Sequence, residues 1–228
     1  MIGDSISLGQ EGAAQAAALD WEIVHAPSFT SGSNNNDNAH WHDMCAEQWL
    51  GPDVSRWDAI TINAGAHDLA FPDNEHISAS SYAVFVERVL RMLLSKVKQS
   101  AVVVWARITP VPTDPPPQCV LIPGRLEVDV ARYNEAADNV VSTIRNGNPA
   151  SALSSCDLHK VITDVCGATY ATCNITQCAG PHFSAEGFAL LGNKTAACVA
   201  LASSTRQSWA APARWAPTAS PWGIQGSH

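Results

Sequence analysis

The sequence predicts an α/β fold in which a mainly parallel sheet carries helices on both faces. Short apolar runs of strand length, such as 57–63 and 101–105, alternate along the chain with longer segments whose apolar residues recur at helical spacing. The clearest helical period covers 80–97, with one apolar face made of Val84, Phe85, Val89, Leu90, Leu93, Leu94 and Val97. Alternating strands and helices are joined by right-handed crossovers, which favour parallel strands with helices on both sides of the sheet.

The first strand of this sheet is expected to be truncated. Only Met1 and Ile2 precede the turn Gly3-Asp4-Ser5, whereas a strand normally has about five residues. The elements predicted next are an Ala-rich helix over 8–19, a short strand over 21–25, a Ser-, Asn- and Gly-rich loop over 26–38, and a helix over 39–50 that ends at Gly51-Pro52.

The same alternation continues to about residue 205. The predicted elements are a strand over 57–63, the helix over 80–97, a buried strand over 101–105, a Pro-rich loop over 109–123, a helix over 128–144, a short strand or helix near Val161, and a last helix over 183–203. We assign 1–205 to one α/β domain and 206–228 to a C-terminal tail, in which Trp209, Trp215 and Trp222 lie among Ala, Pro and Ser. An extended tail is favoured over an aromatic platform for sugar rings, because nothing there fixes the ring planes.

Composition excludes several classes of protein. The 228 residues include 13 Lys and Arg against 21 Asp and Glu, a net charge of -8, and no basic stripe, which argues against nucleic acid as a partner. No apolar run approaches the roughly 18 residues that a transmembrane helix needs. Charged residues make up only 15% of the chain, and 14 Gly and 14 Pro are typical of a loop-rich secreted protein.

The cysteines support export from the cell. There are seven, at positions 45, 119, 156, 166, 173, 178 and 198, and the four between 156 and 178 are expected to form local disulfides in an oxidising compartment. The odd count leaves one thiol unpaired or paired between chains. A zinc site is the alternative, but the spacings are not those of zinc ligands. Two sequons, at Asn174 and Asn193, agree with a secreted, N-glycosylated protein.

Ser5 and His182 are the candidate nucleophile and general base. Gly3 permits a tight turn from strand to helix, so the Ser5 hydroxyl would lie at the positive end of the helix that follows. An ordinary helix cap is the alternative for Ser5, and a surface-loop histidine is the alternative for His182. In a doubly wound sheet, the loop after an early strand and the loop before the last helix can share the carboxyl edge, where active sites form.

Two other loops are expected at the same edge. His67, in Asn63-Ala64-Gly65-Ala66-His67-Asp68 after the strand over 57–63, is a candidate hydrogen-bond donor to an oxyanion, with a buried structural histidine as the alternative. Gly32, in the loop Ser31-Gly32-Ser33, is a candidate backbone donor to the same oxyanion.

Together these four blocks resemble the SGNH hydrolases, also called the GDSL lipase/esterase family, in the family's order and over most of residues 1–202. The blocks are Gly3-Asp4-Ser5 for the nucleophile, Gly32 for the glycine, Gly65-Ala66-His67-Asp68 for Gly-x-Asn-Asp with His in place of Asn, and His182 for the last histidine. A Gly-x-His-Asp branch of the family is similar in further places: Trp57-Asp58, Leu69, Thr109-Pro110-Val111-Pro112 and Tyr133-Asn134. The resemblance implies a flavodoxin-like three-layer α/β/α sandwich and ester hydrolysis without a metal or cofactor.

The chain departs from the family's pattern at two positions. The last block is usually Asp-x-x-His, but Ala179 stands three residues before His182, and Gly180 is not acidic either. We expect a backbone carbonyl, or a distant acid such as Asp157 or Asp164, to orient the imidazole, since a triad enzyme without an orienting carboxylate loses several orders of magnitude in rate. His67 stands in place of an amide, and a neutral imidazole still donates one N–H.

The resemblance implies a serine esterase. The polar Ser and Asn residues over 28–38, which are expected to line one side of the cleft, favour short acyl esters, carbohydrate O-acetyl esters among them. Ser5 would attack and His182 would accept its proton, while the N–H groups of Ser5 and Gly32 and the ring of His67 hold the oxyanion. Asp4 and Asp68 would support the surrounding loops through hydrogen bonds. The alternative, suggested by Ala179, is a catalytically impaired binding protein. A nucleotide-binding domain is disfavoured because no glycine-rich phosphate loop is present.

Overall fold

A computed structural model describes residues 1–18, 20–25, 38–69, 76–111, 125–167, 172–177 and 181–210. Its sheet has, within these residues, four parallel strands in the order β1-β2-β3-β4. The strands are β1 (Ile2–Gly3), β2 (Ala59–Asn63), β3 (Val102–Ala106) and β4 (Leu153–Cys156). The predicted parallel α/β architecture is confirmed, and β1 has only two residues.

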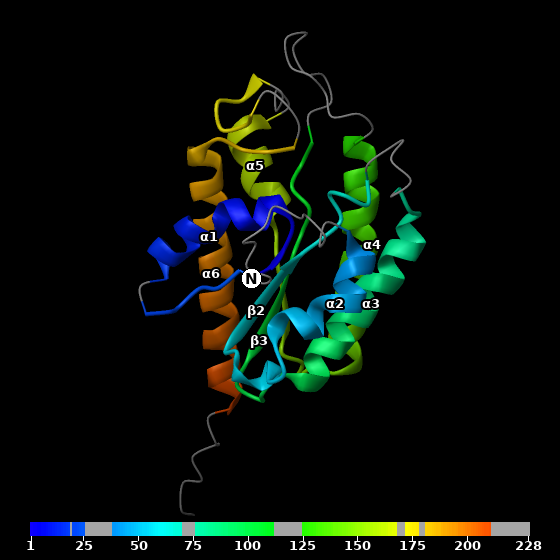
Figure 1. Ribbon diagram of the computed structural model, residues 1–228, viewed down its shortest axis with the longest axis vertical. Coiled ribbons are helices and arrows are strands. Elements are labelled where there is room, and N and C mark those ends of the chain that lie inside the picture. The colour runs from blue at the N-terminus through cyan, green and yellow to red at the C-terminus, as the bar shows by residue number, and fades with distance from the viewer. Residues whose placement is uncertain are drawn as a thin grey trace, which may run out of the picture.

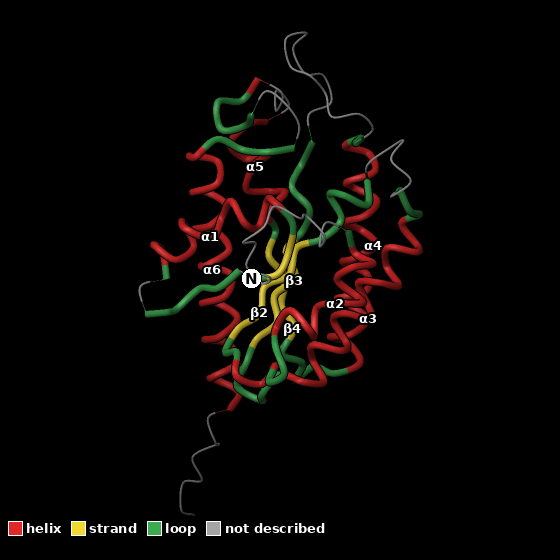
Figure 2. Tube along the Cα trace, viewed as in Figure 1, coloured by secondary structure: helices red, strands yellow, loops and turns green. Residues whose placement is uncertain are grey.

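Helices cover both faces of the sheet, which gives three layers (Figures 1 and 2). One face carries α1 (Ser5–Ala17), α5 (Leu158–Cys166) and α6 (Ala185–Ala210). The other carries α2 (Ala39–Leu50), α3 (Ala79–Lys96) and α4 (Glu127–Gly147). A 3-10 turn, η1 (Val54–Arg56), leads into β2. These helices confirm the predicted ones to within a few residues at most ends.

The central strand β3 is buried on both sides because its side chains alternate between two cores. Val103 and Trp105 join the core beneath α2, α3 and α4. Val102 and Val104 join the core beneath α1, α5 and α6. Because β3 lies between two helical layers, every position along it is buried, and its sequence is a continuous apolar run.

Residues 21–25 do not form the predicted strand. Their backbone groups bond to α1 instead: the Gln15 side chain donates to the carbonyl of Trp21 at 2.5 Å and accepts from the N–H of Ile23 at 2.7 Å. The carboxylate of Glu11 accepts from the N–H of His25 at 3.0 Å. These bonds occupy groups that a strand would use in pairing, so the segment is extended without belonging to the sheet.

Three further differences lie near the C-terminus. The sequence pattern predicts a single short element near Val161, but β4 and α5 both form there. The sequence of β4 is Leu-Ser-Ser-Cys, and only its two ends are buried, so its apolar pattern is weak. The last helix begins at Ala185 rather than 183 and continues to Ala210, beyond its predicted end at 203. Residues 211–228 of the predicted tail lie outside the described residues.

Among the described residues, two disulfides hold the layer of α5 and α6. Cys156–Cys198 joins the end of β4 to α6, and Cys166–Cys173 closes the turn after α5. The second bond is local, as predicted, and it occupies two of the sulfurs that a zinc site would need. Cys156, by contrast, pairs with a cysteine 42 positions away and not within 156–178 as expected. Cys45 has a free thiol, while Cys119 and Cys178 fall outside the described residues. No described helix is long and apolar enough to cross a bilayer.

Candidate active site

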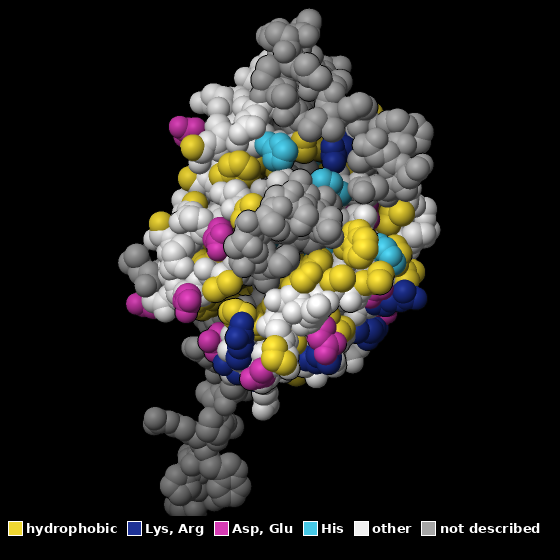
Figure 3. Space-filling view, in the orientation of Figure 1, with side chains coloured by type: hydrophobic (Ala, Val, Ile, Leu, Met, Phe, Trp, Pro, Cys, Tyr) yellow, Lys and Arg dark blue, Asp and Glu magenta, His cyan; other side chains and the backbone are white. Residues whose placement is uncertain are grey.

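The carboxyl ends of the four strands gather the predicted functional segments at one edge of the sheet. Ser5 follows β1 and begins α1, and the block Gly65–Asp68 follows β2. This arrangement follows from the parallel topology, because the carboxyl ends of parallel strands meet at the same edge. The space-filling view shows histidine side chains and a cationic side chain close together on one face (Figure 3).

Ser5 and His182 are in direct contact at this edge. The Ser5 Oγ lies 2.8 Å from the Nε2 of His182, although the two residues are 177 positions apart in the chain. The Ser5 side chain is exposed at the first turn of α1, while His182 is half-buried just before α6. A hydroxyl and an imidazole at this distance have the geometry of a nucleophile and its general base.

The loop that carries His182 is fixed by backbone hydrogen bonds on both sides. Gln177 donates its N–H to the carbonyl of His182 at 2.9 Å, and Ser184 donates to the carbonyl of Ile175 at 2.9 Å. Between them, Phe183 forms an isolated antiparallel bridge with Thr176, and its side chain is fully buried. The imidazole therefore projects from an anchored turn.

The packing of α1 on α6 brings the two side chains together. These helices lie side by side across one face of the sheet (Figure 1). A buried hydrogen bond joins them, from the Oγ1 of Thr195 to the Oε1 of Gln10 at 2.8 Å. Ser5 lies at the start of one helix and His182 just before the start of the other, so the position of each depends on this contact.

Asp4 caps α1 directly beneath the nucleophile. Its Oδ1 accepts from the N–H of Ile6 at 2.8 Å, and its carbonyl accepts from the hydroxyl of Ser7 at 2.8 Å. Burial raises the pKa of the Asp4 carboxyl to about 6, although the cap bond to Ile6 and the charge of Arg125 oppose that shift. Gly3 precedes it, where a Cβ would lie 2.7 Å from the carbonyl oxygen of Asn63.

Three side chains fix the block that follows β2 through its backbone carbonyls. The hydroxyl of Tyr82 donates to Ala64 at 2.8 Å, the Nε of Arg125 donates to Ala66 at 2.5 Å, and the hydroxyl of Tyr133 donates to Asp68 at 3.2 Å. These donors come from α3, from the segment before α4, and from α4 itself. The block is thus held at every second residue.

Gly65 and Asp68 show why this block needs its particular residues. Gly65 has a φ of +122°, and a Cβ there would lie 2.4 Å from the Cδ1 of Ile108. The buried carboxylate of Asp68 accepts from the N–H of Ala39 at the start of α2, at 2.9 and 3.1 Å to its two oxygens. Asp68 therefore joins the loop after β2 to the next helical layer.

His67 and His182 both have weakened affinity for a proton. Burial lowers the pKa of His67 to about 4, and the charges of Arg125 and His182 act in the same direction. Burial also lowers the pKa of His182, with a further contribution from Arg125. Both imidazoles are therefore neutral at pH 7, which leaves His67 able to donate one N–H and His182 able to accept a proton.

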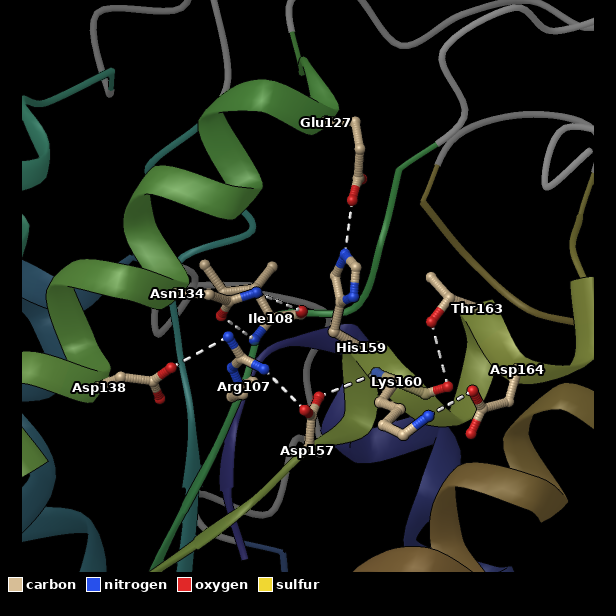
Figure 4. A network of polar contacts seen from close by, with 10 residues as sticks. All are labelled: Arg107, Ile108, Glu127, Asn134, Asp138, Asp157, His159, Lys160, Thr163 and Asp164. Atoms are coloured by element: carbon tan, nitrogen blue, oxygen red, sulfur yellow. Dashed lines mark hydrogen bonds and ion pairs between the residues drawn. The ribbon is translucent and has the colours of Figure 1, made fainter. Parts of the chain in front are cut away.

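The two distant acids considered for His182 bond to other residues, as Figure 4 shows. Asp157 accepts from Arg107 at 2.6 Å and caps α5 at the N–H of Lys160, and Asp164 pairs with Lys160 at 2.6 Å. Asp157 thus joins the start of α5 to Arg107, and Asp164 pairs within α5. Neither has a hydrogen bond to His182 among the described residues, so neither orients the imidazole as expected. Ala179, Gly180 and the candidate oxyanion residue Gly32 fall outside the described residues.

Arg125 was not predicted from the sequence. The residue stands at the end of a Pro-rich segment, without a periodic pattern or motif around it, so nothing in the sequence indicated that its charge lies near His67 and His182. Tyr133-Asn134 was noted only as a point of resemblance. In the structure, Tyr133 contacts the block after β2, and Asn134 exchanges two hydrogen bonds, of 2.8 and 3.0 Å, with the backbone of Ile108.

The fold is a three-layer α/β/α sandwich that is also found in solved structures of other proteins. A solved structure that shares it is a carbohydrate acetylesterase from Sinorhizobium meliloti, with a TM-score of 0.57 and 15% identity over 88% of this chain and 96% of that one. For an extracellular lipase from Streptomyces rimosus, the TM-score is 0.49 and the sequence identity is 14%, over 88% of this chain and 97% of that one. For a phospholipase A1 from Streptomyces albidoflavus, the TM-score is 0.46 and the sequence identity is 18%, over 85% of this chain and 97% of that one. No protein-family model and no curated protein matches the sequence.

Proposed function

We propose that the protein is a serine esterase that hydrolyses short acyl esters through a covalent acyl-enzyme. The observation that carries this proposal is the 2.8 Å contact between the Ser5 Oγ and the His182 Nε2 at the carboxyl edge of the sheet. The contact agrees with the resemblance of the sequence blocks to SGNH hydrolases. An acetylesterase with the same fold acts on carbohydrates, so we include O-acetylated sugars among the candidate substrates.

In the first half of the reaction, Ser5 attacks the ester carbonyl while His182 accepts the hydroxyl proton. The negative charge that develops on the carbonyl oxygen is stabilised by the positive end of α1 and by the N–H of Ser5. The neutral ring of His67 and the N–H of Gly32 are the further donors in this proposal. His182 then returns the proton to the departing alcohol oxygen, and the acyl group stays on Ser5.

Water completes the cycle by the same steps. His182 removes a proton from the water, the hydroxide attacks the acyl carbonyl, and the returning proton releases Ser5 and the free acid. Asp4 and Asp68 take no part in bond making: Asp4 caps α1, and Asp68 holds the loop after β2 against α2. The alternative of an impaired binding protein is not favoured, because the contact between Ser5 and His182 is intact.

Hydrolysis of p-nitrophenyl acetate and butyrate tests the proposal. Ser5→Ala should reduce turnover by a factor of at least about 10³, since it removes the atom that forms the acyl-enzyme. Ser95→Ala is the matched control: Ser95 is exposed on α3, where its hydroxyl bonds only within its own helix, and its loss should leave the rate unchanged. Full activity in Ser5→Ala, or no hydrolysis by the unmodified protein, would contradict the proposal.

We also propose that the protein is exported. The two disulfides favour an oxidising compartment. Asn174 and Asn193 are both exposed, as the acceptor of an N-linked glycan must be, so each remains a candidate for that modification.

A further inference from the structure

Arg125 is the fixed cation of the candidate site. Its Nε donates to the carbonyl of Ala66 at 2.5 Å, directly before His67, and its side chain is partly buried just upstream of α4. The same guanidinium acts electrostatically on Asp4 beneath Ser5 and on both imidazoles. Arg125 is thus positioned against three separate segments of the site: the start of α1, the loop after β2 and the loop before α6.

We propose that Arg125 is a positioning residue of the esterase site: it holds the Gly65–Asp68 block through Ala66 and places a fixed positive charge beside the two imidazoles. This inference rests on the proposed function, because it assigns Arg125 a role in the same reaction. It goes beyond that function by giving a role in the site to a residue outside the four sequence blocks.

The effect of Arg125 on the pKa of His182 is opposite to the effect of the carboxylate in a catalytic triad. An aspartate beside the base stabilises the imidazolium and raises the pKa of the histidine, whereas a neighbouring guanidinium destabilises the imidazolium. A base that resists protonation remains able to accept the Ser5 proton at lower pH. The rate of an enzyme with Arg125 should therefore persist further into the acid range than the ordinary histidine pKa would allow.

The other ionisable groups around His182 do not reverse this sign. Asp4, from α1, is buried, and its own pKa is raised, so part of its charge is lost near pH 6. His67, from the loop after β2, adds no negative charge in either form. Glu186, at the start of α6, is exposed and accepts a hydrogen bond from Ser184 at 2.8 Å. Arg125 is the charged group that contributes to the lowered pKa of His182, after burial.

Two variants separate the charge of Arg125 from its hydrogen bond. Arg125→Gln removes the charge, while Arg125→Lys keeps a cation but cannot reproduce the Nε–H directed at Ala66. Arg132→Gln is the matched control, because Arg132 is an exposed residue of α4 that pairs only with Asp129, at 3.0 Å. The measurement is kcat/KM for p-nitrophenyl acetate from about pH 4 to about pH 9, where the acid limb reports the general base of the free enzyme.

The acid limb of Arg125→Gln should move to higher pH, and that of Arg125→Lys should stay close to that of the unmodified protein. Both variants should lose about tenfold in kcat on the plateau, the typical effect of losing one charge-assisted hydrogen bond. Arg132→Gln should change neither the pH of the acid limb nor kcat on the plateau. An unmoved acid limb in Arg125→Gln, or an equal displacement in Arg125→Lys, would overturn the inference.

A titration of the His182 ring by nuclear magnetic resonance distinguishes this inference from the proposed function. The midpoint should rise in Arg125→Gln whether or not any ester is cleaved. If the unmodified protein cleaves no ester, the esterase proposal fails while this midpoint still tests the effect of the Arg125 charge. An unchanged midpoint in a protein that does cleave esters would reject the role of Arg125 alone.

Discussion

At the scale of single residues, the site combines an exposed hydroxyl with neutral, partly buried imidazoles. Ser5 is exposed on the first turn of α1, while the acid beneath it is buried. Burial does two things here: it lowers the proton affinity of His182 and His67, and it raises that of Asp4. Burying Asp4 therefore lowers the free energy of unfolding most at a pH where its carboxyl is ionised.

Asp4→Asn tests this cost. The pKa of Asp4 is raised from 3.8 to about 6, so the folded chain binds its proton more tightly than the unfolded chain does. Its contribution to stability is complete below about pH 4 and is lost as the pH rises through about 6. Asn also caps helices but does not ionise. The stability of Asp4→Asn relative to the unmodified protein should therefore increase by about 2 kcal/mol between pH 4 and pH 7.

Denaturant unfolding at the two pH values measures that difference. Asp43→Asn, on α2, is the control, because Asp43 is only partly buried and its partner Arg88, at 3.4 Å, is exposed, so this pair contributes little to stability. A relative stability of Asp4→Asn that does not change between the two pH values would show that Asp4 is not held in a desolvated position.

Ser5, His182 and the Gly65–Asp68 block could be found from the sequence because each lies where a predicted strand or helix begins or ends. Their meeting at one edge then follows from the parallel topology. Arg125 could not be found, because its position depends on the path of an irregular segment. The partner of Asp157 could not be found either, since Arg107 lies 50 positions away along the chain.

At the scale of helices and strands, the contact between α1 and α6 is the feature on which the site depends. Each helix begins beside one member of the reacting pair, and the bond between Gln10 and Thr195 lies between them in a buried position. A buried amide oxygen that loses its donor costs its full desolvation penalty.

Thr195→Val should therefore destabilise the protein by about 1–3 kcal/mol, since valine fills the space of threonine but leaves the Gln10 oxygen without this donor. Thr143→Val serves as the control. The Thr143 hydroxyl is exposed and bonds within α4 to Asn139 at 2.8 Å, so its loss should cost much less. Equal midpoints of thermal unfolding for the two variants would contradict the proposed importance of the α1–α6 contact.

The order of elements was predictable because both faces of the central strands are buried and the helices between them are strongly periodic. Two segments were not. Residues 21–25 have the composition of a strand, yet Gln15 and Glu11 on α1 take up their backbone groups. β4 was missed because Ser154 and Ser155 at its centre interrupt the apolar pattern, although β3 pairs with it along its length.

At the scale of the whole molecule, the fold joins the first residues of the chain to a loop near its end. Parallel strands place Ser5 at the carboxyl edge, the anchored loop before α6 places His182 there, and Cys156–Cys198 fixes α6 to β4. The protein carries a net charge of -8, yet a cation lies beside the candidate site. The local charge around His182 is thus opposite in sign to that of the whole chain.

Covalent labelling with a serine-directed aryl phosphonate, located by mass spectrometry, tests the central claim most directly. Such a reagent reacts with a hydroxyl only where a base activates it and nearby donors stabilise the anion that forms. We predict one phosphonyl group for each chain, carried by Ser5, with labelling lost in His182→Ala and unchanged in Ser95→Ala. Labelling of a different residue, or rapid labelling of Ser5 in His182→Ala, would contradict the account.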